Sequence, residues 1–401
     1  MKATKIEEPL RMEDFLRPQL LQRLARLVHF QWERNPEDNR MVNTSKWPFW
    51  VSAILNLVFF TCNGWDIIGH LWLGQPTNQN PPVISITIYF SIRGLMLYLK
   101  RNAIVEFVND LDRECPRDLA SQLDMQMDHT YRYFWKRFHI VQAYGHVGGL
   151  AFCLMPLVLF FLTHEGNGSP VAQQEQLLGG WLPLGVRNDP KFYLFVWLYD
   201  FYCTVSGISF FITFDNLFNV MQSHLIMHLN HLARQISVLD PRQSLTNEVQ
   251  FFSHLKSLVQ RQQLLNDFCG RYNEIFKVAL LVSNFVGAGS LCFFLFMFSE
   301  TSDLLIMGQY IIPAFVLVVF TFEICLRGTQ LEEASEGLES SLCHQEWYLG
   351  SQRYRKFYLI WMQYSQRTQK LGAFGLVEVN MVHFTDIMQL AYRLFTFLKS
   401  N

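Results

Sequence analysis

Seven long apolar blocks divide this chain, and they constrain its fold more than any other feature. The clearest block, VALLVSNFVGAGSLCFFLFMF, contains no charged residue. A bilayer core needs about 20 mostly apolar residues per helix, and only helices or closed barrels satisfy their backbone groups in lipid. The sequence therefore predicts an all-α membrane protein with seven transmembrane helices at Trp47–Gly69, Pro82–Leu99, Phe138–Thr163, Phe192–Val220, Ile275–Phe298, Leu304–Leu326 and Gly372–Leu398.

The basic residues predict how these helices are threaded through the membrane. Lys and Arg concentrate before the first span and between spans 2 and 3, 4 and 5, and 6 and 7. The remaining loops hold only Arg187 and Lys191. Because basic residues accumulate on the cytoplasmic side, we expect a cytoplasmic N-terminus and an extracellular C-terminus. This orientation is opposite to that of a G-protein-coupled receptor, whose Asp-Arg-Tyr and Asn-Pro-x-x-Tyr motifs are also absent after span 3 and in span 7.

The spans divide the chain into regions with long cytoplasmic helical extensions. Apolar residues at helical spacing extend span 5 inward through Phe251, Leu255, Leu258, Leu265 and Phe268. We expect one short cytoplasmic helix around Leu338, Leu342 and Trp347, and another around Phe357, Ile360, Trp361 and Tyr364. The predicted regions are a cytoplasmic segment (1–46), spans 1–4 (47–220) with an outer loop (164–191), a cytoplasmic helical loop (221–274), spans 5–6 (275–326), cytoplasmic anchor helices (327–371) and span 7 (372–401).

Catalytic and metal-binding motifs are not found in the sequence. There is no His-Glu-x-x-His, Gly-x-Ser-x-Gly, phosphate loop or Cys-x-x-Cys, so we expect no enzyme and no cofactor. The cysteines have no spacing typical of metal ligands, so we expect no metal. A net charge of −1 gives no indication of nucleic-acid binding. We expect membrane lipid to surround the spans of this chain.

A polar stripe runs along the last predicted span. Its members recur at steps of three and four residues, which places them on one helix face: Asp386, Gln389, Arg393, Thr396 and Ser400. Facing lipid, Asp386 and Arg393 would each cost roughly 2.5 to 3.5 kcal/mol. Two interpretations remain open from the residues alone. The stripe lines an aqueous path, or Asp386 pairs with Arg93 of span 2 while Arg393 and Ser400 reach the outer interface.

Apolar and aromatic residues in the outer halves of spans 2, 3, 4 and 6 are candidates for a small-molecule pocket. Such pockets are mostly apolar with a few polar groups. The candidates are Ile88, Tyr89, Ile92, Phe152, Met155, Leu159, Tyr199, Tyr202, Ser206, Tyr310 and Pro313. Asp200 is a candidate to orient a polar ligand, and Asp215 to join the cytoplasmic anchor. Glu323 and Arg327 are spaced for a solvated salt bridge at the inner end of span 6.

The segment from Ser340 to the end resembles the C-terminal region of insect odorant receptors. The similar pieces are SSLCHQEWY with its Trp347, then RYRKFYLIWMQYSQR with Ser365-Gln366, then Leu371-Gly372-Ala373, and finally AYRLFTFLKS. The Thr-Tyr…Gln-Phe ending of insect gustatory receptors is absent, as is the long insertion of the odorant co-receptor between spans 4 and 5. The chain therefore looks like a ligand-tuning odorant receptor subunit.

This resemblance implies a function and assigns roles to residues. Members of the family are odorant-gated, non-selective cation channels that assemble as tetramers with a shared co-receptor, in the plasma membrane of olfactory neuron dendrites. The seventh helix lines the pore, and cytoplasmic helices carrying Trp347 and Trp361 form the anchor between subunits. Carried over through Phe395, the family's constriction falls at Phe397 and its polar ring at Ser400. A gustatory-type channel and a metabotropic seven-helix chemoreceptor are the alternatives.

Phe397 and Arg393 depart from the family pattern. The family more often has a smaller aliphatic side chain at the constriction than the phenyl ring of Phe397. A ring of positive charge at Arg393 would repel cations. A heteromer in which only some subunits carry this arginine would reduce that repulsion.

Overall fold

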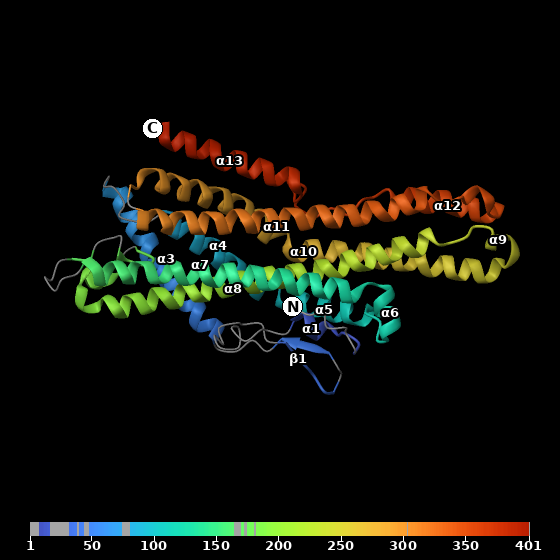
Figure 1. Cartoon of the computed structure of the whole chain (residues 1–401), viewed down its shortest axis with the longest axis horizontal. Helices are drawn as coiled ribbons and strands as arrows, with labels where there is room; N and C mark the ends of the chain where they lie inside the picture. Colours follow the sequence, from blue (N-terminus) through green and yellow to red (C-terminus); the bar gives the residue numbers. More distant parts are fainter. Residues whose placement is uncertain are drawn as a thin grey trace.

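Seven long helices form the body of the protein, arranged as an elongated bundle (Figure 1). The computed structural model describes residues 8–16, 32–37, 40–43, 48–73, 81–163, 170–171, 175–179, 182–302 and 304–400. The long helices are α3 (Pro48–Leu73), α4 (Pro81–Leu99), α7 (Met127–Thr163), α8 (Tyr193–Ser237), α10 (Glu248–Glu300), α11 (Leu304–Cys343) and α13 (Met381–Ser400). Each contains one of the apolar blocks found in the sequence.

Four of these helices, α7, α8, α10 and α11, are much longer than a membrane is thick. Helix α10 has 53 residues, which at 1.5 Å per residue gives about 80 Å, against about 30 Å for a bilayer core. Among the described residues, three helices are apolar and long enough to span by composition alone: Pro190–Ser237, Glu248–Glu300 and Tyr310–Leu349. Shorter apolar stretches lie in α3, α4 and α7 at Trp50–Trp65, Ile84–Leu99 and Val147–Thr163. The long helices therefore extend well beyond the membrane.

The extensions form a second packed region with the short helices (Figure 1). Here the ends of α8, α10 and α11 pack with α5 (Arg101–Glu114) and α12 (Gln352–Ser365). Apolar side chains from all five helices are buried in one cluster, including Phe107, Leu225, Leu265, Leu338 and Trp361. The predicted inward extension of span 5 is thus continuous with the span, because no proline interrupts residues 248–300.

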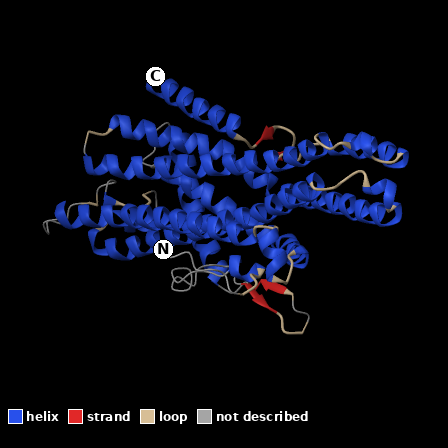
Figure 2. Cartoon of the chain, turned by 45° about the vertical axis from the view of Figure 1, so that its right-hand side comes forward, coloured by secondary structure: helices blue, strands red, loops and turns tan. Residues whose placement is uncertain are grey.

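Short helices and two small hairpins complete the described part of the chain (Figure 2). Strands β1 and β2 pair antiparallel with Trp32 opposite Asn43, and β3 and β4 pair with Gly372 opposite Glu378. Asn109 of α5 holds the first hairpin by bonding both backbone groups of Met41, at 2.7 and 2.9 Å. The remaining elements are α1 (Met12–Leu16), β1 (Trp32–Arg34), β2 (Met41–Asn43), α6 (Leu119–Asp124), η2 (Pro183–Asn188), η3 (Pro190–Phe192), α9 (Gln243–Thr246), η4 (Trp347–Leu349), β3 (Gly372–Ala373) and β4 (Val377–Glu378).

Two predicted helix boundaries are wrong. The last span begins at Met381 rather than Gly372, because the preceding residues form the β3–β4 hairpin, whose turn holds Phe374 and Gly375 at positive φ. This hairpin lies so close to α11 that a Cβ at Gly328 would be 1.8 Å from the carbonyl oxygen of Val379. The short helix predicted around Leu338 and Leu342 is instead the end of α11.

A buried charge network ties α7, α8 and α11 together, and it corrects a predicted ion pair. Arg137 donates to Asp215 at 2.6 Å and also pairs with Glu323. Arg327 is buried rather than solvated, and it donates to Asn219 at 3.0 Å and to Gln330 at 2.8 Å. The predicted Glu323–Arg327 salt bridge is therefore wrong, since Arg137 of a neighbouring helix supplies the positive charge that Glu323 needs.

Removing Arg137 is expected to destabilise the bundle strongly. Arg137→Ala leaves the buried carboxylate of Asp215 and the half-buried one of Glu323 without their cation, a loss of about 3 to 5 kcal/mol. Arg132→Ala, on the same helix, removes only an exposed pair with Asp128, worth about 0.5 kcal/mol or less. Thermal melting of the purified variants in detergent, followed by size-exclusion chromatography, should show a large drop for the first and almost none for the second. Equal melting temperatures would contradict the structural role of this network.

Candidate functional site

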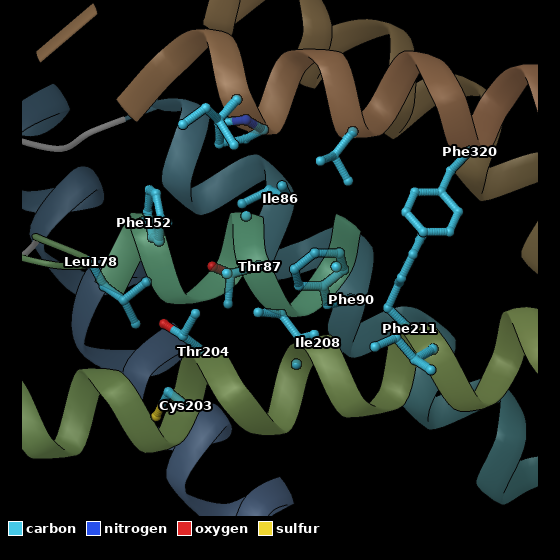
Figure 3. Close-up of a pocket in the computed structure, with 18 of the residues that line it drawn as sticks. Ile86, Thr87, Phe90, Phe152, Leu178, Cys203, Thr204, Ile208, Phe211 and Phe320 are labelled. Atoms are coloured by element: carbon cyan, nitrogen blue, oxygen red, sulfur yellow. The ribbon is translucent and has the colours of Figure 1, made fainter. Parts of the chain in front are cut away.

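An apolar cavity lies inside the membrane bundle, between α4, α7, α8 and α11 (Figure 3). Its volume is about 80 Å³. Helix α10 contributes one lining residue, and the outer loop contributes another. The lining residues are Ile86, Thr87, Phe90, Gly145, Gly148, Gly149, Phe152, Leu178, Cys203, Thr204, Gly207, Ile208, Phe211, Ile212, Phe294, Ile312, Pro313, Val316 and Phe320.

Glycines open this space by leaving α7 and α8 without side chains where they face the cavity. A Cβ added at Gly149 would lie 2.6 Å from Cδ1 of Ile208. One added at Gly207 would lie 3.1 Å from the ring of Phe90. Small residues allow helices in a membrane to approach closely. The glycines therefore fix both the spacing of the helices and the shape of the cavity between them.

The lining is chemically suited to a small, mostly apolar molecule. Phe211 and Phe320 meet edge to face, with ring centroids 4.2 Å apart, and Phe152 and Leu178 lie toward the opposite end (Figure 3). Two hydroxyl groups, from Thr87 and Thr204, are the main polar groups in the lining (Figure 3). The Thr204 hydroxyl donates to the carbonyl of Asp200 at 2.8 Å, and its lone pairs remain available to accept a hydrogen bond.

A buried arginine lies behind the aromatic end of the cavity. The guanidinium carbon of Arg93 is 4.5 Å from the ring centroid of Phe211, 4.8 Å from that of Phe214 and 4.4 Å from that of Tyr89. Arg93 also donates to Tyr89 and, at 3.3 Å, to Ser283. These contacts hold the charge by cation–π attraction. They do not include Asp386, which lies exposed on α13.

Of the eleven residues predicted to contact a ligand, Phe152 and Pro313 line the cavity. On α8 the predicted face is rotated away from it: Tyr199 donates to the carbonyl of Leu55 at 2.9 Å, and Tyr202 bonds with Ser52 at 3.0 Å. Ser206 accepts from Asn56 at 3.1 Å. This face packs on α3, and the adjacent face, with Cys203, Thr204, Gly207 and Ile208, meets the cavity.

The other six predicted residues lie near the cavity or elsewhere in the bundle. Tyr89 is buried and bonded by Arg93, and Tyr310 is buried in a cluster with Phe294 and Phe320. The methyl group of Met155 faces α11, 3.7 Å from where a Cβ on Gly308 would lie. The remaining three residues are half-buried and are not among the described residues that line the cavity: Ile88, Ile92 and Leu159.

Asp200 secures the outer loop over the cavity. Its carboxylate accepts from Arg187 at 2.6 and 3.1 Å and from the backbone amide of Leu178 at 3.2 Å. All three groups are buried. Because Arg187 already neutralises this carboxylate, Asp200 is suited to holding Leu178 in the lining rather than to binding a ligand itself. Sequence analysis missed Leu178, since it lies in a loop without helical periodicity.

The polar stripe of α13 faces away from the rest of the chain. Ile387 and Ala391 are buried against the bundle. The residues predicted to line a pore are all exposed: Asp386, Gln389, Arg393, Thr396, Phe397 and Ser400. Helix α13 lies at the outside of the bundle, with the C-terminus at its far end (Figure 1). One face of a transmembrane helix is thus both polar and uncovered.

The two tryptophans predicted to anchor subunits pack within this chain. Trp361 is buried and donates from its indole to Gln262 of α10. Trp347 stacks on Tyr358, with ring centroids 5.5 Å apart and planes 11° apart. Both side chains fix α12 against the long helices. Helix α12 leaves other apolar side chains exposed, among them Leu359 and Ile360.

Comparison with known proteins agrees with the fold and the C-terminal resemblance. Residues 75–392 match the family described as 7tm odorant receptor. Odorant receptor 88a of Drosophila melanogaster is 74% identical over 401 residues, which is 100% of both chains. Putative odorant receptor 69a, isoform B, of the same species is 23% identical and covers 98% of this chain and 100% of its own length.

Solved structures with the same fold are also known. The insect olfactory receptor OR5 from Machilis hrabei aligns with a TM-score of 0.73 at 15% identity, over 94% of this chain and 97% of that one. Its structure in complex with eugenol aligns with a TM-score of 0.72 at 14% identity, over 97% and 100%. The predicted helical seven-transmembrane fold is confirmed. The chain belongs to the 7tm odorant receptor family, whose members are receptors and not enzymes.

Proposed function

We propose that this chain is the ligand-tuning subunit of an odorant-gated, non-selective cation channel formed with a shared co-receptor. The observation that carries the proposal is the exposed polar face of α13. In a single chain this face would lie against lipid, where Asp386 and Arg393 would each cost roughly 2.5 to 3.5 kcal/mol. Around a central aqueous path shared by several subunits, the same residues are hydrated and the cost disappears.

The proposed pore has a constriction and a polar ring near its extracellular end. Phe397 is 63% exposed and lies on the same side of α13 as the stripe, so neighbouring subunits would bring their side chains together at this level. Ser400 lies one turn further along and supplies hydroxyl groups. A hydrophobic constriction excludes water until it widens. Outward movement of α13 would then open the path to ions.

Subunit contacts are proposed to form in the cytoplasmic region, around α12. Leu359 and Ile360 expose 55% and 70% of their side chains there, and exposed apolar residues on a packed helix are suited to an interface. Trp347 and Trp361 hold α12 in place. The assembly we propose is a heterotetramer in the plasma membrane of olfactory neuron dendrites, with residues 1–46, 221–274 and 327–371 in the cytoplasm.

The cavity between α4, α7, α8 and α11 is the proposed odorant site. Its aromatic and aliphatic lining with two threonine hydroxyls matches a small volatile molecule carrying one polar group. The related receptor OR5 has been solved with eugenol, a small molecule. Since α11 forms one wall of the cavity and also packs against α13, a ligand that fits the open form better would shift the population toward the open pore.

The channel function predicts current without second messengers. In a non-olfactory cell expressing this chain and the co-receptor, an odorant panel should evoke current in excised patches without nucleotides. Current that requires G proteins would favour a metabotropic receptor instead. Cells expressing either chain alone give the baseline.

Changes on the pore face should alter permeation. A positive charge about 4 Å from a cation in water repels it by about 1 kcal/mol, so Arg393→Ala should raise cation conductance by up to about fivefold. Phe397→Ala widens the constriction and should raise the current that flows without odorant. Arg132→Ala, at an exposed position of α7, is the matched control. If conductance, selectivity and basal current all stay at wild-type values in both variants, α13 does not line the pore.

Filling the cavity should weaken the odorant response. Gly149→Ala pushes the end of Ile208 into the cavity, because the new methyl group would otherwise lie 2.6 Å from it. Overpacking of this kind costs about 1 to 3 kcal/mol, so the concentration for half-maximal current should rise by about fivefold or more. Gly64→Ala, whose Cβ would meet nothing within 4 Å, should leave it unchanged at equal surface expression. Identical dose–response curves would rule out this cavity as the site.

A further inference from the structure

A cysteine and two histidines meet in the packed region where α5 ends against α8. Cys115 directly follows α5, and His224 and His228 lie one turn apart on α8. Each offers one potential ligand atom, and these three atoms lie within 4.8 Å of one another. All three side chains are buried. The cluster is remote from the cavity and from the stripe on α13, and the proposed channel does not use it.

We propose that Cys115, His224 and His228 form a binding site for a thiophilic divalent cation of the Zn²⁺ class. One thiolate and two imidazoles are donors that zinc prefers, and three protein ligands leave a fourth position for water. Zinc–sulfur and zinc–nitrogen bonds of about 2.3 and 2.05 Å at a tetrahedral angle put the two ligand atoms about 3.5 Å apart. Sγ of Cys115 lies 3.7 Å from Nδ1 of His224. Small side-chain rotations would therefore complete the geometry.

The histidines have nitrogens that the surrounding protein leaves unsatisfied. Among the described residues, Nε2 of His224 and Nε2 of His228 are buried without a hydrogen-bond partner. Buried polar atoms in native proteins nearly always have one. A cation bound to Sγ of Cys115 and Nδ1 of His224 would give Nε2 of His228 the partner it lacks, when that nitrogen carries no proton. This observation is independent of the distances within the cluster.

Arg261 competes with the cation for one of the rings. Its guanidinium lies 3.0 Å from Nδ1 of His228 and also pairs with Glu114 at 3.1 Å. While Nδ1 accepts from Arg261, the neutral ring carries its proton on Nε2 and cannot bind a metal there. If Arg261 turns fully to Glu114, the proton moves to Nδ1 and Nε2 becomes a ligand. Removing Arg261 should therefore tighten binding.

Metal binding at this site exchanges a proton for the cation. Burial raises the pKa of the Cys115 thiol to about 12, so the empty site holds S–H rather than thiolate. When the sulfur–metal bond forms, the S–H bond breaks and the proton leaves to solvent, with no change of oxidation state. The bound cation would link α5 to α8 across 109 positions of sequence. It would also fix the surface on which Phe15 of α1 packs, 4.6 Å from the ring of His224.

Cobalt provides a spectroscopic test that does not depend on channel activity. The full-length chain, purified in detergent with reducing agent and stripped of metal, should bind one equivalent of Co²⁺. The spectrum should show sulfur-to-cobalt charge transfer, and Zn²⁺ should displace it. Cys115→Ser should abolish the charge-transfer band. His228→Gln should weaken Zn²⁺ binding by about tenfold or more, since even outer-shell changes cost that much, and Arg261→Gln should strengthen it.

Cys269→Ser is the matched control, because Cys269 is equally buried but lies outside the cluster. It should bind Co²⁺ as the unmodified chain does. If Cys115→Ser does not purify as a single species, the melting temperature of the unmodified chain decides: it should rise with Zn²⁺, and the rise should shrink in His228→Gln. No stoichiometric Co²⁺ binding, a band unchanged in Cys115→Ser, or a melting temperature indifferent to Zn²⁺ would overturn the site. None of these outcomes bears on whether the chain conducts ions.

Discussion

The requirement that a polar helix face be kept out of hydrocarbon underlies the organisation of this protein. Charged residues inside the bundle are paired within the chain, as Arg137 of α7 is with Asp215 of α8 and Arg187 of η2 is with Asp200 of α8. Helix α13 differs, because its polar residues point away from the bundle. Contact with lipid would be energetically costly for that face. An aqueous path enclosed by several subunits would hydrate the same residues. In the channel that we propose, this helix is therefore the element that requires partner subunits.

The long helices provide the mechanical connection between the regions. Helices α8 and α11 contribute to the cavity at one end and to the packed region around α5 and α12 at the other. Helix α13 begins immediately after the hairpin that packs on α11, so its inner end is fixed while its outer end lies freely exposed. A ligand that moves α11 would consequently displace α13 most at its outer end, where Phe397 and Ser400 lie. In the channel that we propose, this arrangement would separate assembly, around α12, from gating, at the far end of α13.

Much of the fold could be predicted from the sequence, because a helix that crosses the hydrocarbon core of a bilayer must be long and apolar. The spans, the helical extension before Ile275 and the face of the stripe all follow from periodicity. The residues that line the cavity were harder to predict. The periodicity of α8 shows which residues share a face, but not which neighbouring helix each face contacts. Tyr199 and Ser206 accordingly pack on α3, whereas Thr204 and Ile208 meet the cavity. Contacts between distant segments, such as Arg137 with Glu323 or Cys115 with His224, leave no local pattern.

The central claim is that the stripe of α13 faces water in the assembled channel, and cysteine accessibility measures this directly. Single cysteines at Gln389, Thr396 and Ser400 would be compared with cysteines at Ile387 and Ala391, in channels containing the co-receptor and opened by odorant. A charged, membrane-impermeant thiol reagent should modify the three stripe positions and change the current, while the two buried positions stay unmodified. Modification that does not distinguish the two faces, or modification of the stripe that leaves the current unaltered, would contradict a pore lined by α13.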